Sequence, residues 1–297
     1  MQSSLICIAD IDLLKSRSKI LNLNINFIKI KSLKSAKQNK IGTVQFIQAG
    51  KCKDLEPGTL NPKNSKYVLN NLNFGIAESL KNKKVGLVTG PIQKSNIIDG
   101  GFKRFQGHTE WIKKKTQSDH VVMLLSSKKI KVALATTHVP LAEVPKNIQK
   151  SKLVEIIKIL HSGLKAKFKI RYPVITVLGL NPHAGEDGKM GKEEIKIINP
   201  AVQICRNIGI DASYAISADT AFNTEKLKQT DAYLAMYHDQ ALPVLKALSF
   251  GEAVNITLGI PIVRTSVDHG TALDIAGKMK PNLGSIKQAI KSAEIQL

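Results

Sequence analysis

The stretch KVALATTHVPLAEVPKNIQKSKLVEIIKILHSGLKAKFKIRYPVITVLGLNPHAGE, residues 131–186, contains the pattern that decides the fold. It begins with the apolar run KVALATT, passes through a polar turn and a helical period over 150–167, and reaches a second run, VITVLGL. Both runs are nearly continuous rather than alternating, which is typical of strands buried on both faces. A strand, a helix and another strand in this order predict an α/β protein with a largely parallel core sheet.

The same pattern recurs on both sides of this stretch. Further strand-like runs are LICIAD (5–10), INFIKI (25–30), TVQFIQA (43–49), VGLVTG (85–90), VVMLLSS (121–127), AYLAMY (232–237) and VNITLG (254–259). Between the runs, the spacing of apolar residues predicts helices over 64–82, 150–167, 192–208 and 284–295. No internal repeat or low-complexity linker interrupts the chain, so composition alone marks no domain boundary.

Composition excludes several classes of protein. The chain has 297 residues, of which 43% are hydrophobic, and this excludes a mostly disordered protein. No apolar run approaches the roughly 18–20 residues that a membrane-spanning helix needs. The start, MQSSLICIADIDLLK, lacks a basic segment and meets two aspartates at once, unlike a signal peptide. Three well-separated cysteines argue against a disulfide scaffold and predict a cytoplasmic location without membrane partners.

The charge is strongly basic, with 44 Lys and Arg against 23 Asp and Glu, a net +21. A basic chain raises the question of nucleic acid binding. Only five of the basic residues are arginine, however, and the lysines are dispersed along the chain. Base reading and bidentate phosphate contacts favour arginine, so we interpret the lysines as solvated surface and expect no nucleic acid partner.

Residues with chemical function gather directly after the apolar runs. Ligands of open α/β sheets bind just beyond the carboxyl ends of the strands. Segments rich in Gly, His, Asp and Asn occupy that position at 90–110, 135–140, 178–194, 235–246 and 254–277. Polar groups at such density cost folding free energy unless they serve a site. The sequence therefore predicts a site built from several strand ends.

Three of the seven histidines follow strand-like runs: His138, His183 and His238. Strand ends of a parallel sheet can bring such residues to one point although they are far apart in the chain. Three imidazoles that leave further positions open are a normal ligand set for Zn²⁺ or another first-row divalent metal. From spacing alone, three separately satisfied histidines are the alternative interpretation.

The motifs resemble one family. The strings are GHTE (107–110), TTHVPL (136–141), GLNPHAGEDGKMGKEE (179–194), SADT (217–220), AMYHDQALPVLK (235–246), GEAVNITLG (251–259) and VRTSVDHGTALDIAG (263–277). In this order and combination they resemble the 4-hydroxythreonine-4-phosphate dehydrogenase family of pyridoxal phosphate (vitamin B6) biosynthesis. The resemblance implies an isocitrate/isopropylmalate-dehydrogenase-like fold with two α/β domains and a cleft between them. The implied domains are 1–101 with 276–297, and 102–275, in a homodimer whose active site lies at the interface.

The resemblance also implies roles for individual residues. One divalent metal per subunit (Zn, Co or Mg) would be held by His138, His183 and His238. The phosphorylated small-molecule substrate would be contacted by His108, Thr109, Lys246, Asn255 and Arg264, with Lys246 expected on the turn after the strand. The chain has no G-x-G-x-x-G motif, and NAD would be bound by the loop residues His269, Gly270, Thr271 and Asp274. The other interpretation of this loop is a plain helix that Thr271 caps. Asp219 and Asp239 are both candidates for the general base.

The implied reaction is NAD-dependent oxidation and decarboxylation of 4-phosphooxy-L-threonine to 3-amino-2-oxopropyl phosphate. One alternative is a sister enzyme acting on D-threonate or D-erythronate 4-phosphate, although Lys189-Met190 favours the vitamin B6 substrate. Family members usually begin with a strand and a GDPxGIGPE turn, and this chain starts after that unit. Either the start codon is misassigned or the unit is absent. If it is absent, a strand and a loop near the active site are lost, and an inactive remnant becomes the further alternative.

Overall fold

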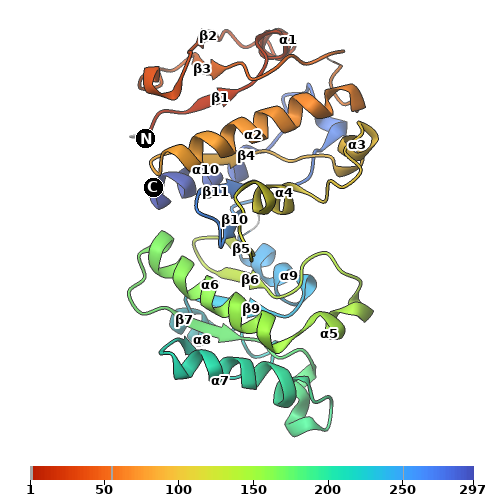
Figure 1. Cartoon of the computed structure of the whole chain (residues 1–297), viewed down its shortest axis with the longest axis vertical. Helices are drawn as coiled ribbons and strands as arrows, with labels where there is room; N and C mark the ends of the chain where they lie inside the picture. The colour runs from red at the N-terminus through yellow and green to blue at the C-terminus, as the bar shows by residue number, and fades with distance from the viewer. Residues whose placement is uncertain (1–2, 55, 250) are drawn as a thin grey trace. The chain divides into compact units, whose positions relative to one another are not determined.

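The computed structural model describes residues 3–54, 56–249 and 251–297. The chain divides into two compact units (Figure 1). Unit 1 comprises Met1–Leu87, Pro91–Thr116 and His269–Leu283, and unit 2 comprises Val88–Gly90, Gln117–Asp268 and Gly284–Leu297. The domain boundaries that the resemblance implies stay a prediction. Within the described residues, no helix is both long and apolar enough to cross a membrane.

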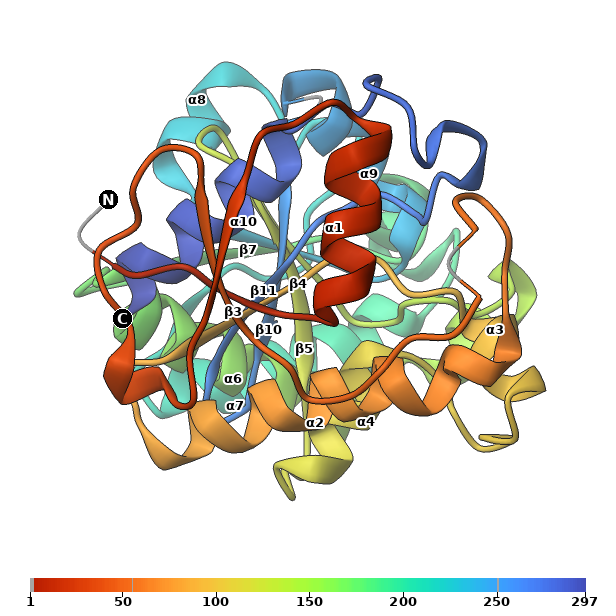
Figure 2. The ribbon, with the colours of Figure 1, turned by 90° about the horizontal axis from the view of Figure 1, so that it is seen from above.

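Unit 1 contains a small parallel sheet. Its strands are β1 (Ile6–Ile8), β3 (Thr43–Ile47) and β2 (Asn26–Lys29), in the order β1-β3-β2. The buried Asp10 links the two long helices of the unit. Its side chain accepts from the Asp12 backbone N–H at 3.1 Å and caps α1 (Ile11–Ile20), while its own N–H donates to the Tyr67 hydroxyl in α2 (Ser65–Lys81). Figure 2 shows that α1 and α2 run in different directions.

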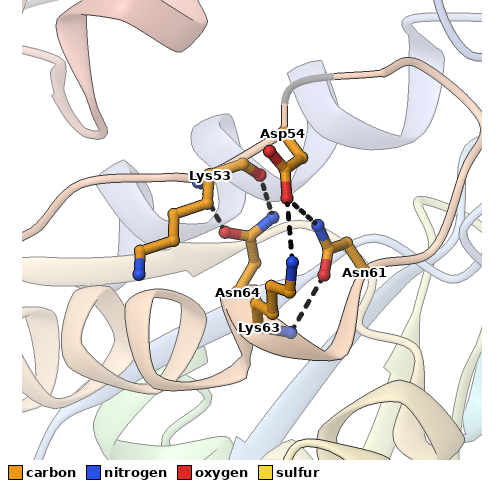
Figure 3. Close-up of polar contacts among 5 residues, drawn as sticks. All are labelled: Lys53, Asp54, Asn61, Lys63 and Asn64. Carbon is orange, nitrogen blue, oxygen red and sulfur yellow. Dashed lines mark hydrogen bonds and ion pairs between the residues drawn. The ribbon is translucent and has the colours of Figure 1, made fainter.

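The loop that leads into α2 is fixed by its own side chains (Figure 3). Asn64 exchanges two hydrogen bonds with the backbone of Lys53, both at 2.7 Å. The Asp54 carboxylate accepts from Asn61 Nδ2 at 3.2 Å and lies 3.5 Å from the Lys63 ammonium. Asn61 also caps the short turn Pro62–Asn64. The remaining helices of this unit are α3 (Lys94–Asp99) and α4 (His108–Lys115).

A larger sheet runs through unit 2. Among the described residues it has eight strands in the order β4-β11-β10-β5-β6-β9-β7-β8. Their bounds are β4 (Gly86–Thr89), β5 (Val122–Ser126), β6 (Lys131–Leu134), β7 (Val174–Val177), β8 (Asp211–Ala212), β9 (Ala232–Ala235), β10 (Val254–Leu258) and β11 (Val263–Ser266). All nine predicted strand runs contain a strand, so the α/β prediction is confirmed.

The larger sheet is mixed, which corrects the expectation of a largely parallel one. β6, β9, β7 and β8 pair in parallel, whereas β5 is antiparallel to both β6 and β10, and β10 is antiparallel to β11. The connections explain the difference. Only a short turn separates β5 from β6 and β10 from β11, and a parallel pair needs a crossover of a dozen or more residues.

Helices cover both faces of this sheet. The helices of the unit are α5 (Val144–Asn147), α6 (Lys150–Phe168), α7 (Asn199–Asn207), α8 (Thr224–Gln229), α9 (His238–Ser249) and α10 (Gly284–Gln296). Successive residues of one strand belong to different hydrophobic clusters: Leu124 to the one that includes residues of α6 and α7, and Leu125 to the one that includes residues of α9. Burial on both faces explains why the strands are nearly continuous in apolar residues.

The helix predicted over 192–208 is divided. A π-helical turn, Glu194–Ile198, comes first, and α7 then begins at Asn199 with Pro200 in its first turn. Proline has no N–H to donate to the carbonyl one turn earlier, so a regular α-helix cannot run through this position unchanged.

Candidate active site

Three histidines lie at one edge of the larger sheet. The strands β6, β9 and β7 are neighbours and run parallel, so their carboxyl ends share this edge. His138 follows β6, His238 is the first residue of α9 after β9, and His183 lies in the turn Pro182–Gly188 after β7. The order of the strands therefore brings together residues separated by a hundred positions in the chain.

Two of these histidines are in contact. The rings of His138 and His238 lie 5.7 Å apart between centroids. His238 Nδ1 is 2.6 Å from the Asp239 carboxylate, and His183 is exposed in its own turn. Within residues 3–54, 56–249 and 251–297, no three His, Cys, Asp or Glu side chains form a group able to hold a metal ion. Among the described residues the three histidines do not converge as one ligand group, and the three-histidine metal centre stays a prediction.

Hydrogen bonds join the three strand ends beneath the histidines. The buried Thr136 hydroxyl donates to the Met236 carbonyl at 2.7 Å, which links the end of β6 to that of β9. Gln240 accepts from the Met236 N–H at 2.7 Å and donates to the Gly179 carbonyl at 2.5 Å, which adds the end of β7. Thr136 and Gln240 thus fix the backbone from which the histidines project.

The turn that carries His183 has an unusual backbone. His183, Ala184, Glu186 and Asp187 all have φ between 43° and 53°, in the left-handed region. For residues other than glycine this conformation costs roughly 1–2 kcal/mol each. A turn of this kind persists only where its surroundings hold it in place.

Glu194 supplies that support, and sequence reasoning missed it. The side chain is 2% exposed and its carboxylate accepts from the backbone N–H groups of Leu180 and Asn181 at 2.7 and 2.8 Å, and from Asn181 Nδ2 at 3.0 Å. Gly185 lies so close that a Cβ atom there would be 2.6 Å from Glu194 Oε2. The only signal in the sequence was the acidic pair at 193–194, which also fits a solvated helix start. The hydrogen bond from Asn181 lowers the pKa of the neighbouring Glu193.

Each candidate general base lies beside a different histidine. Asp219 is exposed and accepts from the Ser217 hydroxyl, and this hydrogen bond lowers its pKa, with the charge of His183 acting in the same direction. Asp239 is exposed and bonded to His238. Asp239 therefore contacts an imidazole directly, Asp219 only feels the charge of one, and the choice between them stays open.

The expected substrate residues occupy different settings. Arg264, in β11, is 2% exposed, and its guanidinium donates to the hydroxyls of Thr257 at 3.0 Å and Thr89 at 2.9 Å. Asn255, in β10, is half-buried, and among the described residues its Oδ1 has no hydrogen-bond partner. Lys246 was expected on a turn and instead lies exposed within α9, because the helix continues from His238 to Ser249. His108 and Thr109 begin α4 in unit 1, after Gly107.

The expected NAD loop also lies in unit 1. His269 Nδ1 is 2.9 Å from the Gly270 carbonyl oxygen, and the Thr271 hydroxyl donates to Gln93 at 3.0 Å. Thr271 caps no helix: the short turn Leu273–Ile275 follows Ala272, whose side chain makes no cap. Asp274 and Gly270 are exposed, and a Cβ at Gly270 would meet open space. An exposed loop with room beside its glycine fits a cofactor contact.

Comparisons with known proteins agree on one family. The family model of the pyridoxal phosphate biosynthetic protein PdxA matches residues 1–293. The 4-hydroxythreonine-4-phosphate dehydrogenase of Pseudoalteromonas translucida is 44% identical over 291 residues, covering 98% of this chain and 88% of the relative.

Solved structures give the same result. A putative 4-hydroxythreonine-4-phosphate dehydrogenase from Salmonella typhimurium matches with a TM-score of 0.90 and 31% identity, over 99% of this chain and 90% of that one. The 4-hydroxythreonine-4-phosphate dehydrogenase of Klebsiella pneumoniae matches with a TM-score of 0.87 and 30% identity, over 98% and 89%. These matches confirm the predicted fold class.

Proposed function

The chain belongs to the PdxA family of pyridoxal phosphate biosynthetic proteins, and from this premise we propose that it is a NAD-dependent 4-hydroxythreonine-4-phosphate dehydrogenase. The reaction oxidises 4-phosphooxy-L-threonine and decarboxylates the product to 3-amino-2-oxopropyl phosphate. The observation that carries the proposal is the 44% identity across 98% of the chain to a relative of that name. The motifs at the carboxyl ends of β6, β9 and β7 are the part of the chain suited to the chemistry.

The reaction needs a hydride acceptor and a base. Asp219 or Asp239 would take the hydroxyl proton of the secondary alcohol, and NAD would supply the acceptor for the hydride that leaves the same carbon. The C–C bond to the carboxylate then breaks, CO₂ leaves, and a proton takes its place on carbon. His269, Gly270, Thr271 and Asp274 would hold the cofactor, which supplies the hydride acceptance when bound.

The substrate phosphate needs fixed cations and donors. Lys246, Asn255 and Arg264 are proposed for it, with His108 and Thr109 as further substrate contacts. Asn255 and Arg264 come from the adjacent antiparallel strands β10 and β11, which supports their acting together. The fork of an arginine suits phosphate better than the point charge of a lysine.

A divalent metal at His138, His183 and His238 is part of the proposal. The residue types and the shared strand edge support it, and the contact between His138 and His238 provides two of the three donors. Assembly of the site requires His183 to approach this pair. Titrating the purified protein with Zn²⁺, Co²⁺ and Mg²⁺ by calorimetry, without substrate, tests the site directly and identifies the metal.

We also expect a homodimer with sites completed across the interface. Light scattering at micromolar concentration measures the assembly. If His138 and Arg264 serve one site from different chains, mixing the His138→Ala and Arg264→Ala proteins restores activity in the mixed dimer. A monomer contradicts this part of the proposal.

The deciding experiment is a substrate comparison. NADH formation is followed with 4-phosphooxy-L-threonine and, in parallel, with D-threonate and D-erythronate 4-phosphates. We expect turnover of the first substrate alone. Turnover of only the sugar-acid phosphates would move the chain to the sister activity, and no turnover of any would contradict the proposal. The cytoplasmic location and the lack of a nucleic acid partner stay predictions from composition.

A further inference from the structure

A lysine joins the two strands that carry Asn255 and Arg264. Lys167 lies in the last turn of α6, and its ammonium donates to the Thr257 carbonyl at 3.3 Å and the Ile262 carbonyl at 3.1 Å. Thr257 belongs to β10, and Ile262 directly precedes β11. One cation therefore binds both sides of the turn that connects the strands.

The same turn is held from a second direction. Gly259 has φ of 82°, and a Cβ atom there would lie 2.4 Å from the His120 carbonyl oxygen. No side chain fits at that distance, so the turn packs with its backbone against residue 120. With Lys167 on its carbonyls as well, the turn has little freedom to shift.

Arg264 is connected to this contact through Thr257. The Thr257 carbonyl accepts from Lys167, and the Thr257 hydroxyl accepts from the Arg264 guanidinium. The pairing of β10 with β11 sets Asn255 opposite Ser266 and Ile256 opposite Thr265. A change in the spacing of the turn would therefore move Asn255 and Arg264 relative to each other.

The charge of Lys167 lowers the stability of the folded chain at this position. Burial lowers the pKa of Lys167 to about 8, and in the described part of the chain no carboxylate forms an ion pair with it. Lys131 is likewise half-buried, but the charge of Asp231 partly offsets its loss of hydration. A half-buried charge held only by neutral carbonyls costs folding free energy, and such groups are concentrated at functional sites.

We propose that Lys167 is a positioning residue for the substrate phosphate: by binding the carbonyls on both sides of the β10–β11 turn, it sets the spacing of Asn255 and Arg264. The inference rests on the proposed function, in which these two residues contact the phosphate. It gives Lys167 no contact with the substrate itself.

The test uses the full chain with Lys167→Met, Lys167→Arg and the control Lys165→Met, an exposed lysine on the same helix. We expect Lys167→Met to raise KM for the phosphorylated substrate about tenfold with a much smaller change in kcat, equal to the loss of about one net hydrogen bond. Its free energy of unfolding should stay equal or increase at neutral pH. Lys167→Arg should recover part of the affinity, and Lys165→Met should leave KM unchanged.

A merely structural lysine predicts a different result: lower stability and a lower apparent kcat from the smaller folded fraction, with KM unchanged. If Lys167→Met does not fold, Lys167→Gln, which keeps one donor group, takes its place with the same expectations. Calorimetric binding of inorganic phosphate separates this inference from the proposed function. If the unaltered protein binds phosphate but does not turn over the substrate, the proposed function fails. If Lys167→Met and Lys167→Gln bind phosphate as tightly as the unaltered protein, the positioning role is wrong.

Discussion

The histidine-bearing edge of the large sheet and the β10–β11 strand pair fix polar side chains in opposite ways. At the edge, the buried Glu194 carboxylate accepts from N–H donors and supports the turn of His183, which is itself exposed. In the strand pair, the Lys167 and Arg264 cations supply donors to carbonyl and hydroxyl oxygens. The edge is thus organised by an anion and the strand pair by cations. Neutralising Glu194 at the edge and Lys167 or Arg264 in the strand pair should therefore have different effects on stability and activity.

The largest effect is expected at the edge itself. His238→Ala should reduce turnover to the background and greatly weaken binding of a divalent metal, because it removes a ring that contacts His138 and bonds Asp239. Metal content after dialysis and NADH formation measure the two losses. The exposed His120→Ala is the control and should change neither. Full metal stoichiometry in His238→Ala would contradict the ligand assignment.

The support beneath His183 gives the next effect. Glu194→Gln keeps the shape but places an amide where a carboxylate accepts three hydrogen bonds, so we expect a loss of about 2–3 kcal/mol in the free energy of unfolding. Urea denaturation measures it. Glu193→Gln changes the half-exposed preceding residue, whose carboxylate also accepts from Asn181 Nδ2, and should cost less, about 1 kcal/mol. Equal losses in the two variants would mean that Glu194 does not support the turn specifically.

In the strand pair, Arg264 should affect recognition of phosphate. Arg264→Ala should lower kcat/KM for the phosphorylated substrate roughly ten- to a hundredfold, the equivalent of one charge-assisted hydrogen bond. The loss on dephosphorylated 4-hydroxythreonine should be much smaller, and the affinity for NAD⁺ should hardly change. Arg264→Lys should recover little, because a point charge cannot reproduce the guanidinium fork. Equal losses on both substrates would assign Arg264 to the fold or to the substrate carboxylate.

The two regions also differ in how far the sequence predicts them. The apolar runs predict every strand except β8 and β11. β8 is missed because it has only two residues, and β11 because it closely follows Pro261. The density of polar residues after the apolar runs also predicts that His138, His183 and His238 lie at one edge of the sheet. The sequence does not predict the mixed parallel and antiparallel pairing, because strands buried on both faces have the same nearly continuous apolar pattern in either case. Glu194 and Lys167 bind backbone N–H and carbonyl groups. Every residue has such groups, so no pattern of residue types predicts these contacts.

The smallest effect is a pH dependence of stability that belongs to the strand pair alone. The pKa of Lys167 is about 8 in the folded chain against an ordinary 10.5, so between these values the unfolded chain binds more protons. The free energy of unfolding that Lys167 contributes should therefore rise with pH across this window, by about 2 kcal/mol after allowance for partial exposure. Lys167→Met lacks this group, so the difference in stability between Lys167→Met and the unaltered protein should shrink from pH 7 to pH 10.

Comparison with the variant is essential, because every other titratable group is common to both proteins and its contribution cancels in the difference. Lys165→Met is again the control, and its stability should keep a constant offset from that of the unaltered protein over the same range. A constant offset for Lys167→Met as well would mean that the ammonium is solvated and keeps its ordinary pKa. The cost of burial would then be absent, and with it the reason to infer that the strand pair retains this cation for function rather than for stability.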